Sequence, residues 1–205
     1  DVKAGEKLAV GELLYGLLLP SGNDASVAFA EHFGKRLTPD AKSSYDGFIA
    51  AMNRKAAEIG MKSTHFANPH GLTAEGHQTT AGDLARLATL AFKQPEFRKR
   101  VGTAQHGSTV DSVSGYKRNV VWKATNQLLK TEGYDGIKTG TTGAAGCCLV
   151  STAERDGRRL VIVALGAPST ESRYVDTRNL YRWAWNNLVK IKADAGVSQK
   201  QAKAN

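Results

Sequence analysis

The chain has 205 residues, of which 41% are apolar and 23% charged, a composition typical of a globular protein with one core. No apolar run approaches eighteen residues and no signal peptide is visible, so the sequence predicts no membrane span. The net charge of +9 comes from scattered lysines and arginines without interleaved aromatic residues, which argues against a nucleic-acid groove.

The first half of the chain predicts helices. Four segments place apolar residues at helical spacing, and they cover residues 8 to 19, 24 to 33, 43 to 59 and a stretch that starts at Thr80. Pro20 and Gly60 are the expected ends of the first and third helices. Asp83, three residues after Thr80, gives the fourth helix a start like a capping box. That helix is expected to bury Leu84, Leu87, Ala88 and Ala91.

The second half predicts an antiparallel sheet and a closing helix. A β-hairpin is expected over residues 105 to 123, followed by strands over 135 to 142, 147 to 153 and 159 to 166. Asp156-Gly157 is a strong hairpin signal between the last two strands. Leu160 to Leu165 is continuously apolar, as in a central strand covered on both faces. The core side of a helix over about 170 to 189 is expected to include Val175, Leu180, Trp183 and Leu188.

This order of elements predicts an α+β fold with helices packed against an antiparallel sheet. Residues 1 to 189 form the one expected domain, and residues 190 to 205 are expected to be a polar tail or linker. The two cysteines, Cys147 and Cys148, are adjacent, where disulfide geometry is hard to meet. Because no metal-ligand spacing occurs, we expect two buried thiols and neither a metal nor another cofactor.

The strongest local signal is Lys138-Thr139-Gly140-Thr141-Thr142, on a predicted strand. Gly140 would let the backbone of an edge strand approach a ligand closely, and Lys138 sets a cation beside that edge. The three threonines add hydroxyls. The combination suits a peptide that adds to the strand by main-chain hydrogen bonds and presents a carboxylate. An ordinary edge strand, guarded by a lysine against aggregation, would show the same residues.

A second signal is Ser21-Gly22-Asn23, in a turn between two predicted helices. A hydroxyl and an amide two residues apart, held between packed helices, can both point into one cleft. Helix punctuation after Pro20 accounts for the same residues, because Ser and Asn both favour caps and turns. Taken alone, this turn favours the punctuation reading.

Together and in this order, the two signals resemble the S-x-N and K-T-G motifs of the penicillin-binding proteins and serine β-lactamases. The resemblance covers roughly residues 5 to 188. It includes Met52-Asn53, Ile59 to Leu72, Thr80 to Leu84, Asn126 to Leu129 and Gly136 to Gly146. His70-Gly71-Leu72 stands where a β-lactamase would carry its loop with a Glu base. The chain is therefore most similar to the low-molecular-mass D,D-carboxypeptidases and endopeptidases, which implies their β-lactamase-like fold.

The resemblance implies a serine-type D-alanyl-D-alanine carboxypeptidase or endopeptidase that trims peptidoglycan stem peptides through an acyl-enzyme. Its expected partners are a stem peptide ending in D-Ala-D-Ala and β-lactam antibiotics, and not nucleic acid. Such an enzyme acts in the periplasm or on the outer face of the cytoplasmic membrane. Secretion would use a signal peptide outside this chain, and any membrane association would use other segments outside it.

By resemblance, Ser21 and Lys138 are catalytic residues: Ser21 relays a proton to the leaving amine, and Lys138 polarises Ser21 and attracts the substrate carboxylate. The backbone N–H of Thr141 forms half of an oxyanion hole, worth about 3 kcal/mol in comparable sites. The expected substrate-binding residues are Asn23, Thr139, Gly140, Thr141, Thr142, Arg173 and His70. A solvated helix-end arginine is an equal alternative for Arg173. His70 borders the site in a supporting role.

The chain departs from the family pattern at the first motif, Ser-x-x-Lys, which supplies the nucleophile. No such motif occurs in the twenty residues before Ser21. The one match, Ser114 to Lys117, lies in the predicted hairpin, and about one match is expected by chance. We therefore expect the nucleophile segment to lie outside this chain, and the cleft between Ser21 and Lys138 to be open or filled by that segment. The alternative is a pseudoenzyme that binds wall peptides without hydrolysing them.

Overall fold

The first half of the chain is helical, as predicted. The structure, a computed structural model, describes residues 2–188. Its helices are α1 (Val10–Leu18), α2 (Asn23–Leu37), α3 (Ser44–Glu58), α4 (Ala81–Ala91) and α5 (Pro95–Val101). Local signals set several of the ends. The side chains of Ser43 and Thr80 accept hydrogen bonds from the backbone N–H groups of Asp46 and Asp83, and Gly60 ends α3 with a φ of 76°. The sequence reasoning missed α5, whose signal is Pro95 at its first turn.

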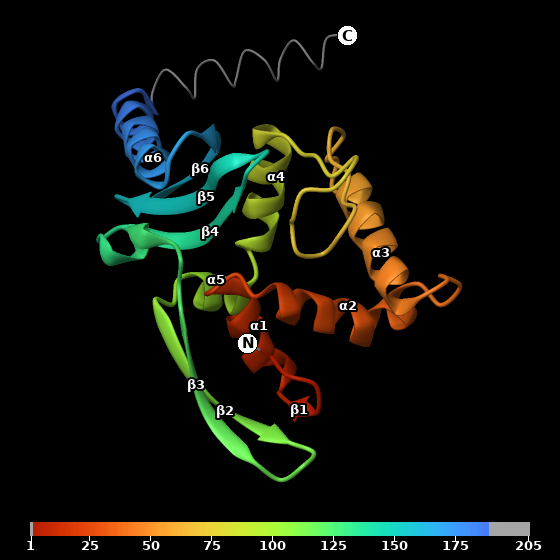
Figure 1. Ribbon diagram of the computed structural model, residues 1–205. Helices are drawn as coiled ribbons and strands as arrows, with labels where there is room; N and C mark the ends of the chain where they lie inside the picture. The colour runs from red at the N-terminus through yellow and green to blue at the C-terminus, as the bar shows by residue number, and fades with distance from the viewer. Residues whose placement is uncertain (1, 189–205) are drawn as a thin grey trace.

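The second half forms the predicted sheet. Strands β4 (Tyr134–Thr142), β5 (Gly146–Arg155) and β6 (Arg158–Ala167) are antiparallel in the order β4-β5-β6. Asp156 and Gly157 have φ values of 51° and 68° in the predicted turn between β5 and β6. Helix α6 (Thr170–Asn186) and helix α4 pack against this sheet, from opposite sides in Figure 1. The α+β prediction is confirmed.

Three expectations about this half are corrected. Strand β6 lies at an edge of the described sheet and β5 is central, so the apolar run from Leu160 reflects cover by helices on both faces and not two flanking strands. Helix α6 buries Tyr174, Thr177, Tyr181 and Ala184, whereas Val175, Leu180 and Trp183 are exposed. Of the two thiols, Cys147 is buried but Cys148 is only half-buried, and both are free.

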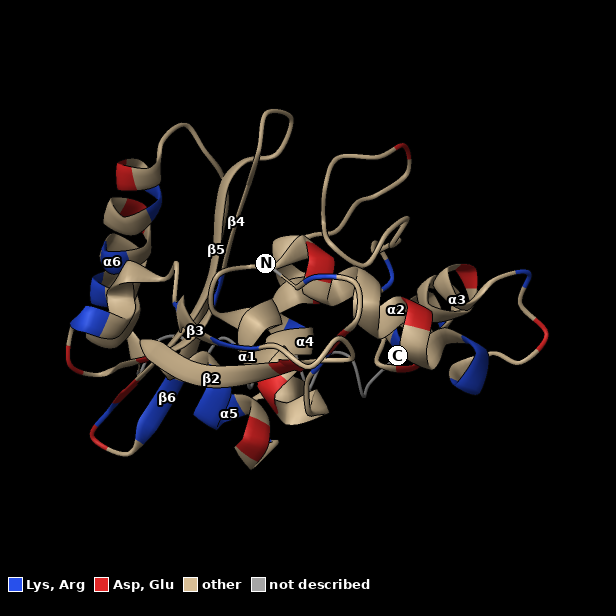
Figure 2. Cartoon of the chain, turned by 60° about the horizontal axis from the view of Figure 1, so that its bottom comes forward, with Lys and Arg blue, Asp and Glu red and all other residues tan. Residues whose placement is uncertain are grey.

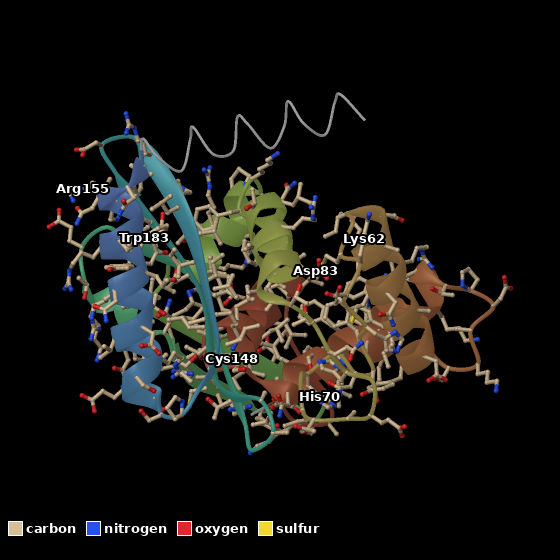
Figure 3. The ribbon with its side chains drawn as sticks, turned by 90° about the horizontal axis from the view of Figure 1, so that it is seen from above. Lys62, His70, Asp83, Cys148, Arg155 and Trp183 are labelled. Carbon is tan, nitrogen blue, oxygen red and sulfur yellow. The ribbon has the colours of Figure 1, made fainter. Side chains whose placement is uncertain are left out.

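The helix α6 error has a physical cause. Aromatic and aliphatic residues occur on several sides of α6, so spacing alone does not select the core face. The sheet selects it through specific partners: the Tyr181 ring packs edge-on against Tyr134, and its hydroxyl lies 3.1 Å from that of Ser151. Trp183, labelled in Figure 3, is 58% exposed on the opposite side of the helix.

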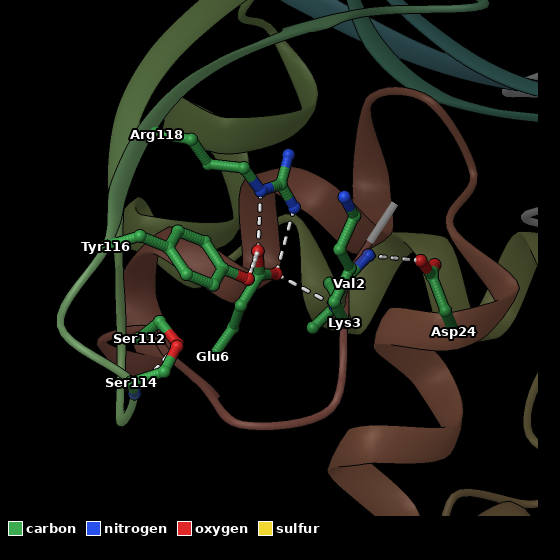
Figure 4. Close-up of polar contacts among 8 residues, drawn as sticks. All are labelled: Val2, Lys3, Glu6, Asp24, Ser112, Ser114, Tyr116 and Arg118. Carbon is green, nitrogen blue, oxygen red and sulfur yellow. Dashed lines mark hydrogen bonds and ion pairs between the residues drawn. The ribbon is translucent and has the colours of Figure 1, made fainter.

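A second sheet holds the predicted hairpin. Strands β2 (Gln105–Ser112) and β3 (Lys117–Lys123) form an antiparallel ribbon that projects from the body, and the short strand β1 (Glu6–Lys7) pairs with the end of β2. The buried Glu6 carboxylate fixes this end: it accepts hydrogen bonds from the Arg118 guanidinium at 2.5 and 2.9 Å and from the Tyr116 hydroxyl at 3.1 Å (Figure 4). These bonds lower the pKa of Glu6 to about 2, with Arg118 as the main cause.

The distribution of charge and the hydropathy of the helices can be read from the described part of the chain. Lys and Arg are spread over several elements and do not gather into one stripe (Figure 2). None of the described helices is long and apolar enough to cross a membrane. The predicted tail, residues 190 to 205, lies outside the described residues.

Candidate active site

Strand β4 carries the K-T-G motif at the edge of its sheet. It pairs with β5 on one side, with Lys138 opposite Val150 and Gly140 opposite Cys148. A Cβ placed on Gly140 would meet no atom within 4 Å, so the backbone is open at this point. An extended peptide could therefore lie along the free edge and exchange main-chain hydrogen bonds with it.

A groove of about 410 Å³ lies beside Lys138. It runs between helix α4 and the sheet, and Leu18 and Phe97 also line it. Apart from Lys138, Thr139 and Cys148, its wall is apolar. Because Leu84, Leu87 and Ala91 line this groove, they are only half-buried, and Ala88 alone of the four predicted core residues of α4 is buried.

Lys138 is half-buried and faces this groove. Its ammonium donates a hydrogen bond to the carbonyl of Thr139 at 2.8 Å, and not to Ser21. Burial lowers the pKa of Lys138 to about 8, and the nearby charge of Arg173 acts in the same direction. A lysine with a pKa near neutrality can gain and lose a proton at working pH, as proton-transfer chemistry requires.

The Ser21–Asn23 turn lies on the helical side of the site. Ser21 has a φ of 63°, an uncommon left-handed backbone for a residue other than glycine, and both Ser21 and Asn23 are exposed. Gly22 is required by space, since a Cβ there would lie 2.6 Å from the carbonyl oxygen of Gly16. Residues in such conformations are enriched at functional sites, so the backbone of Ser21 favours a functional interpretation of this turn.

A residue that the sequence reasoning missed links Leu19, just before this turn, to β4. The backbone N–H of Thr125 donates to the carbonyl of Leu19 at 3.0 Å, and the Thr125 hydroxyl lies 2.6 Å from that of Thr139. The next residue, Asn126, is buried and donates to the carbonyl of Gly136 at 2.9 Å. Residues 125 and 126 thus hold the end of α1 against the K-T-G strand. Only their position in space shows this role.

Arg173 reaches the same strand from α6. The residue is only 5% exposed, and its guanidinium donates to the carbonyls of Gly140 and Cys148 and to the Thr141 hydroxyl at 3.2 to 3.3 Å. Its Nε finds no hydrogen-bond partner among the described residues. A solvated arginine at a helix end is therefore excluded. Arg173 instead places a positive charge behind the free edge of β4.

The loop between α3 and α4 lies across the site from the sheet. Figure 3 shows His70 on this loop and Cys148 on β5. Both ring nitrogens of His70 are engaged near the loop: Nδ1 accepts from the backbone N–H of Leu72 at 3.2 Å, and Nε2 lies 3.4 Å from the Tyr45 hydroxyl. The loop touches β4 through Thr73, whose hydroxyl donates to that of Thr142 at 3.0 Å.

The chance Ser-x-x-Lys match is elsewhere and has local partners. Ser114 lies in the turn of the projecting hairpin, with its hydroxyl 2.8 Å from that of Ser112 (Figure 4). Lys117 forms an ion pair with Asp111 at 3.2 Å. Neither residue lines the groove. Within residues 2–188, no group of three His, Cys, Asp or Glu side chains could hold a metal ion.

These features define a site class: a free strand edge with a half-buried lysine, a serine turn with a left-handed backbone on the helical side, and an apolar groove between α4 and the sheet. Residues 2–169 match the peptidase S11 family, D-alanyl-D-alanine carboxypeptidase. The chain belongs to this family of peptidoglycan-related hydrolases.

Individual relatives agree. D-alanyl-D-alanine carboxypeptidase DacF of Bacillus subtilis is 36% identical over 187 residues, which are 90% of this chain and 45% of DacF. DacD of Escherichia coli is 34% identical over 93% of this chain and 46% of its own length. The chain thus spans about half the length of these relatives. The solved Streptomyces K15 DD-transpeptidase superposes with a TM-score of 0.84 at 32% identity, over 91% of this chain and 71% of that protein.

Proposed function

We propose that this chain provides most of the active site of a serine D-alanyl-D-alanine carboxypeptidase that forms an acyl-enzyme and binds penicillin. One observation carries the proposal: Thr125 joins Leu19, two residues before the Ser21–Asn23 turn, to Thr139 of the Lys138–Thr142 strand, which lines the groove. Family membership supports the substrate class, a peptidoglycan stem peptide that ends in D-Ala-D-Ala.

The reaction begins with the peptide lying along β4. The Thr141 N–H points at the carbonyl oxygen of the penultimate D-Ala, and Asn23 hydrogen-bonds the substrate amide. A serine hydroxyl oxygen attacks the carbonyl carbon, and the tetrahedral intermediate is stabilised by the N–H donor. The serine proton passes through Ser21 to the leaving nitrogen, the C–N bond breaks, and D-Ala departs. Water then hydrolyses the ester.

Lys138 and Arg173 supply the positive field for this chemistry. Lys138, with its pKa near 8, polarises Ser21 and accepts or returns a proton. Arg173 stands behind the strand that receives the terminal carboxylate, which Thr139 and Thr142 contact. The substrate carboxylate would in turn stabilise both cations and offset the two causes that lower the pKa of Lys138, which are its burial and then the charge of Arg173.

The attacking serine belongs to a Ser-x-x-Lys helix that packs into the 410 Å³ groove. An amphipathic helix would cover the apolar wall formed by α4 and the sheet, and its first turn would reach Lys138. Because residues 1–205 carry no such motif before Ser21, these residues alone are expected to release no D-Ala. The complete enzyme acts outside the cytoplasm, where peptidoglycan is found.

The test uses the full natural polypeptide that contains residues 1–205. It should form a covalent adduct with a labelled penicillin, detected by intact-mass spectrometry, and should release D-Ala from a stem pentapeptide. Residues 1–205 expressed alone should do neither. Absence of any adduct with the full polypeptide would refute acyl transfer, and an adduct on Ser21 would make that residue the nucleophile and not the proton relay.

A wall-peptide-binding pseudoenzyme is the second candidate. The exposed Ser21 and the open edge at Gly140 would serve binding equally well. Calorimetry with the stem pentapeptide separates the two candidates, because a pseudoenzyme would bind the peptide without release of D-Ala. An endopeptidase would instead cleave a cross-linked dimer faster than the pentapeptide.

A further inference from the structure

Two threonine hydroxyls join the loop between α3 and α4 to the end of β4. Thr73 Oγ1 donates to Thr142 Oγ1 at 3.0 Å, and the backbone N–H of Ala145 donates to the same oxygen at 3.1 Å. A hydroxyl oxygen has two acceptor positions and one hydrogen. Both acceptor positions of Thr142 are therefore filled, and its own hydrogen is left to point at another group.

The Thr142 side chain lies on the same face of β4 as Lys138. Side chains two residues apart share a face of a strand, so Thr142 follows Lys138 and Gly140, which line the groove. Thr142 is half-buried there, and Arg173 lies behind the same strand. A hydroxyl that can only donate, on the strand face that it shares with Lys138, is matched to an anion.

Hydrogen bonds of one buried side chain order the turn directly before Thr73. The Asn68 side chain is buried and spans the turn: its Oδ1 accepts from Gly71 N–H at 2.7 Å, and its Nδ2 donates to the carbonyl of Leu72 at 2.9 Å. Gly71 has a φ of 83°, which glycine adopts without strain. Thr73 follows directly after this hydrogen-bonded turn.

We propose that Thr73 is a positioning residue that aims the hydroxyl hydrogen of Thr142 at the terminal carboxylate of the bound peptide. The inference rests on the proposed function and deepens it. A carboxylate only accepts hydrogen bonds, whereas a terminal amide also presents donors that this hydroxyl cannot accept. Thr73 thereby makes the site selective for peptides with a free C-terminus, the substrates of a carboxypeptidase.

The experiment compares two stem pentapeptides, one with a free C-terminal carboxylate and one with a C-terminal amide. The full natural polypeptide and its Thr73→Val variant are assayed with both, by the rate of acyl-enzyme formation per substrate concentration. Thr73→Val should lower this rate about tenfold for the carboxylate peptide, the scale of one hydrogen bond to a charged group. The rate for the amide peptide should change less than twofold.

Matched variants separate positioning from general loss of loop structure. Thr73→Ser keeps the hydroxyl and should restore the preference for the carboxylate. Thr79→Val removes a hydroxyl of the same loop, 2.8 Å from that of Thr64, and should leave the preference intact. In the Thr142→Val background, Thr73→Val should have no further effect, because the two residues act as one unit.

The outcomes distinguish the two proposals. A full polypeptide that is never acylated by penicillin or peptide refutes the proposed function and, with it, this inference. An active polypeptide whose preference survives Thr73→Val overturns the inference alone. The inference is also overturned if Thr73→Val slows acyl-enzyme formation equally for both peptides, or if Thr73→Ser does not restore the rate. Thr73 would then be a structural contact only.

Discussion

Two antiparallel ribbons of this protein carry a lysine beside hydroxyl residues, yet only one has the properties of a site. In the β2–β3 hairpin, Lys117 is exposed and paired with Asp111, and the Ser114 hydroxyl is bonded to Ser112. In β4, Lys138 is half-buried beside an apolar groove, and its ammonium donates to a backbone carbonyl. The two ribbons have the same residue types. The burial of the lysine and the hydrogen-bonding groups that remain unused distinguish the candidate site from the chance motif match.

The sharpest test of this comparison replaces each lysine in the full natural polypeptide. Lys138→Ala should slow acylation by penicillin about 10²- to 10⁴-fold, the range for loss of a positioned proton-transfer group. Its melting temperature at neutral pH should not fall, because burial of the charged ammonium opposes folding there. Acylation is measured by the initial rate of adduct formation, and stability by thermal unfolding.

Lys117→Ala is the matched control, since Lys117 also lies on an antiparallel strand beside hydroxyl residues. It should acylate at the rate of the unmodified protein, because a surface ion pair contributes little. Normal acylation of Lys138→Ala together with increased aggregation would instead make Lys138 an edge-strand guard.

A smaller effect is expected from a single methyl group on the free edge of β4. Gly140→Ala should fold normally, since its Cβ would meet no atom within 4 Å. The methyl group would stand where the peptide backbone must approach, so the Kd for a stem peptide should rise about tenfold, the cost of one displaced main-chain hydrogen bond. Calorimetry would measure this change.

Gly143→Ala provides the comparison for Gly140→Ala. Gly143 also has open space around its Cβ position, but it lies in the turn beyond the strand. Peptide affinity should therefore be unchanged. If both substitutions weakened binding equally, the peptide would not lie along the Lys138–Thr142 edge.

The stability of the folded protein should also depend on pH, at acid pH through the hairpin and at alkaline pH through β4. These are the smallest of the expected effects. The pKa of Glu6, which anchors the hairpin, is lowered from 4.5 to about 2, so its stabilisation is present above pH 4.5 and is lost as the pH falls toward 2. The pKa of Lys138 is lowered from 10.5 to about 8, so the folded state binds fewer protons than the unfolded state between these values. Stability should therefore rise with pH from about 8 to 10.5.

Urea denaturation across pH would check both statements. Glu6→Gln should remove part of the acid-induced loss, and Lys138→Met should remove the rise between pH 8 and 10.5. The hairpin anchor should not influence the site on β4, so Glu6→Gln is expected to leave penicillin acylation unchanged. A Lys138→Met variant that keeps the alkaline rise would show that another group causes it.

The sequence alone determined the order of elements, most of their ends and the family. These follow from local chemistry: Thr80 and Ser43 cap helices, Gly60 ends one, and Asp156-Gly157 closes a hairpin. The motifs around Ser21 and Lys138 were equally visible, because their residue types and order are properties of the chain. The fold class could be predicted for the same reason.

Tertiary structure decided what depends on contacts between distant segments. The core face of α6, the edge position of β6, the burial of Arg173 and the link through Thr125 all arise from such contacts. So does the hydroxyl pair of Thr73 and Thr142, which are 69 positions apart in the chain. Each of these features depends on which surfaces pack together. The spacing of residues within one segment does not show which distant segment will pack against it.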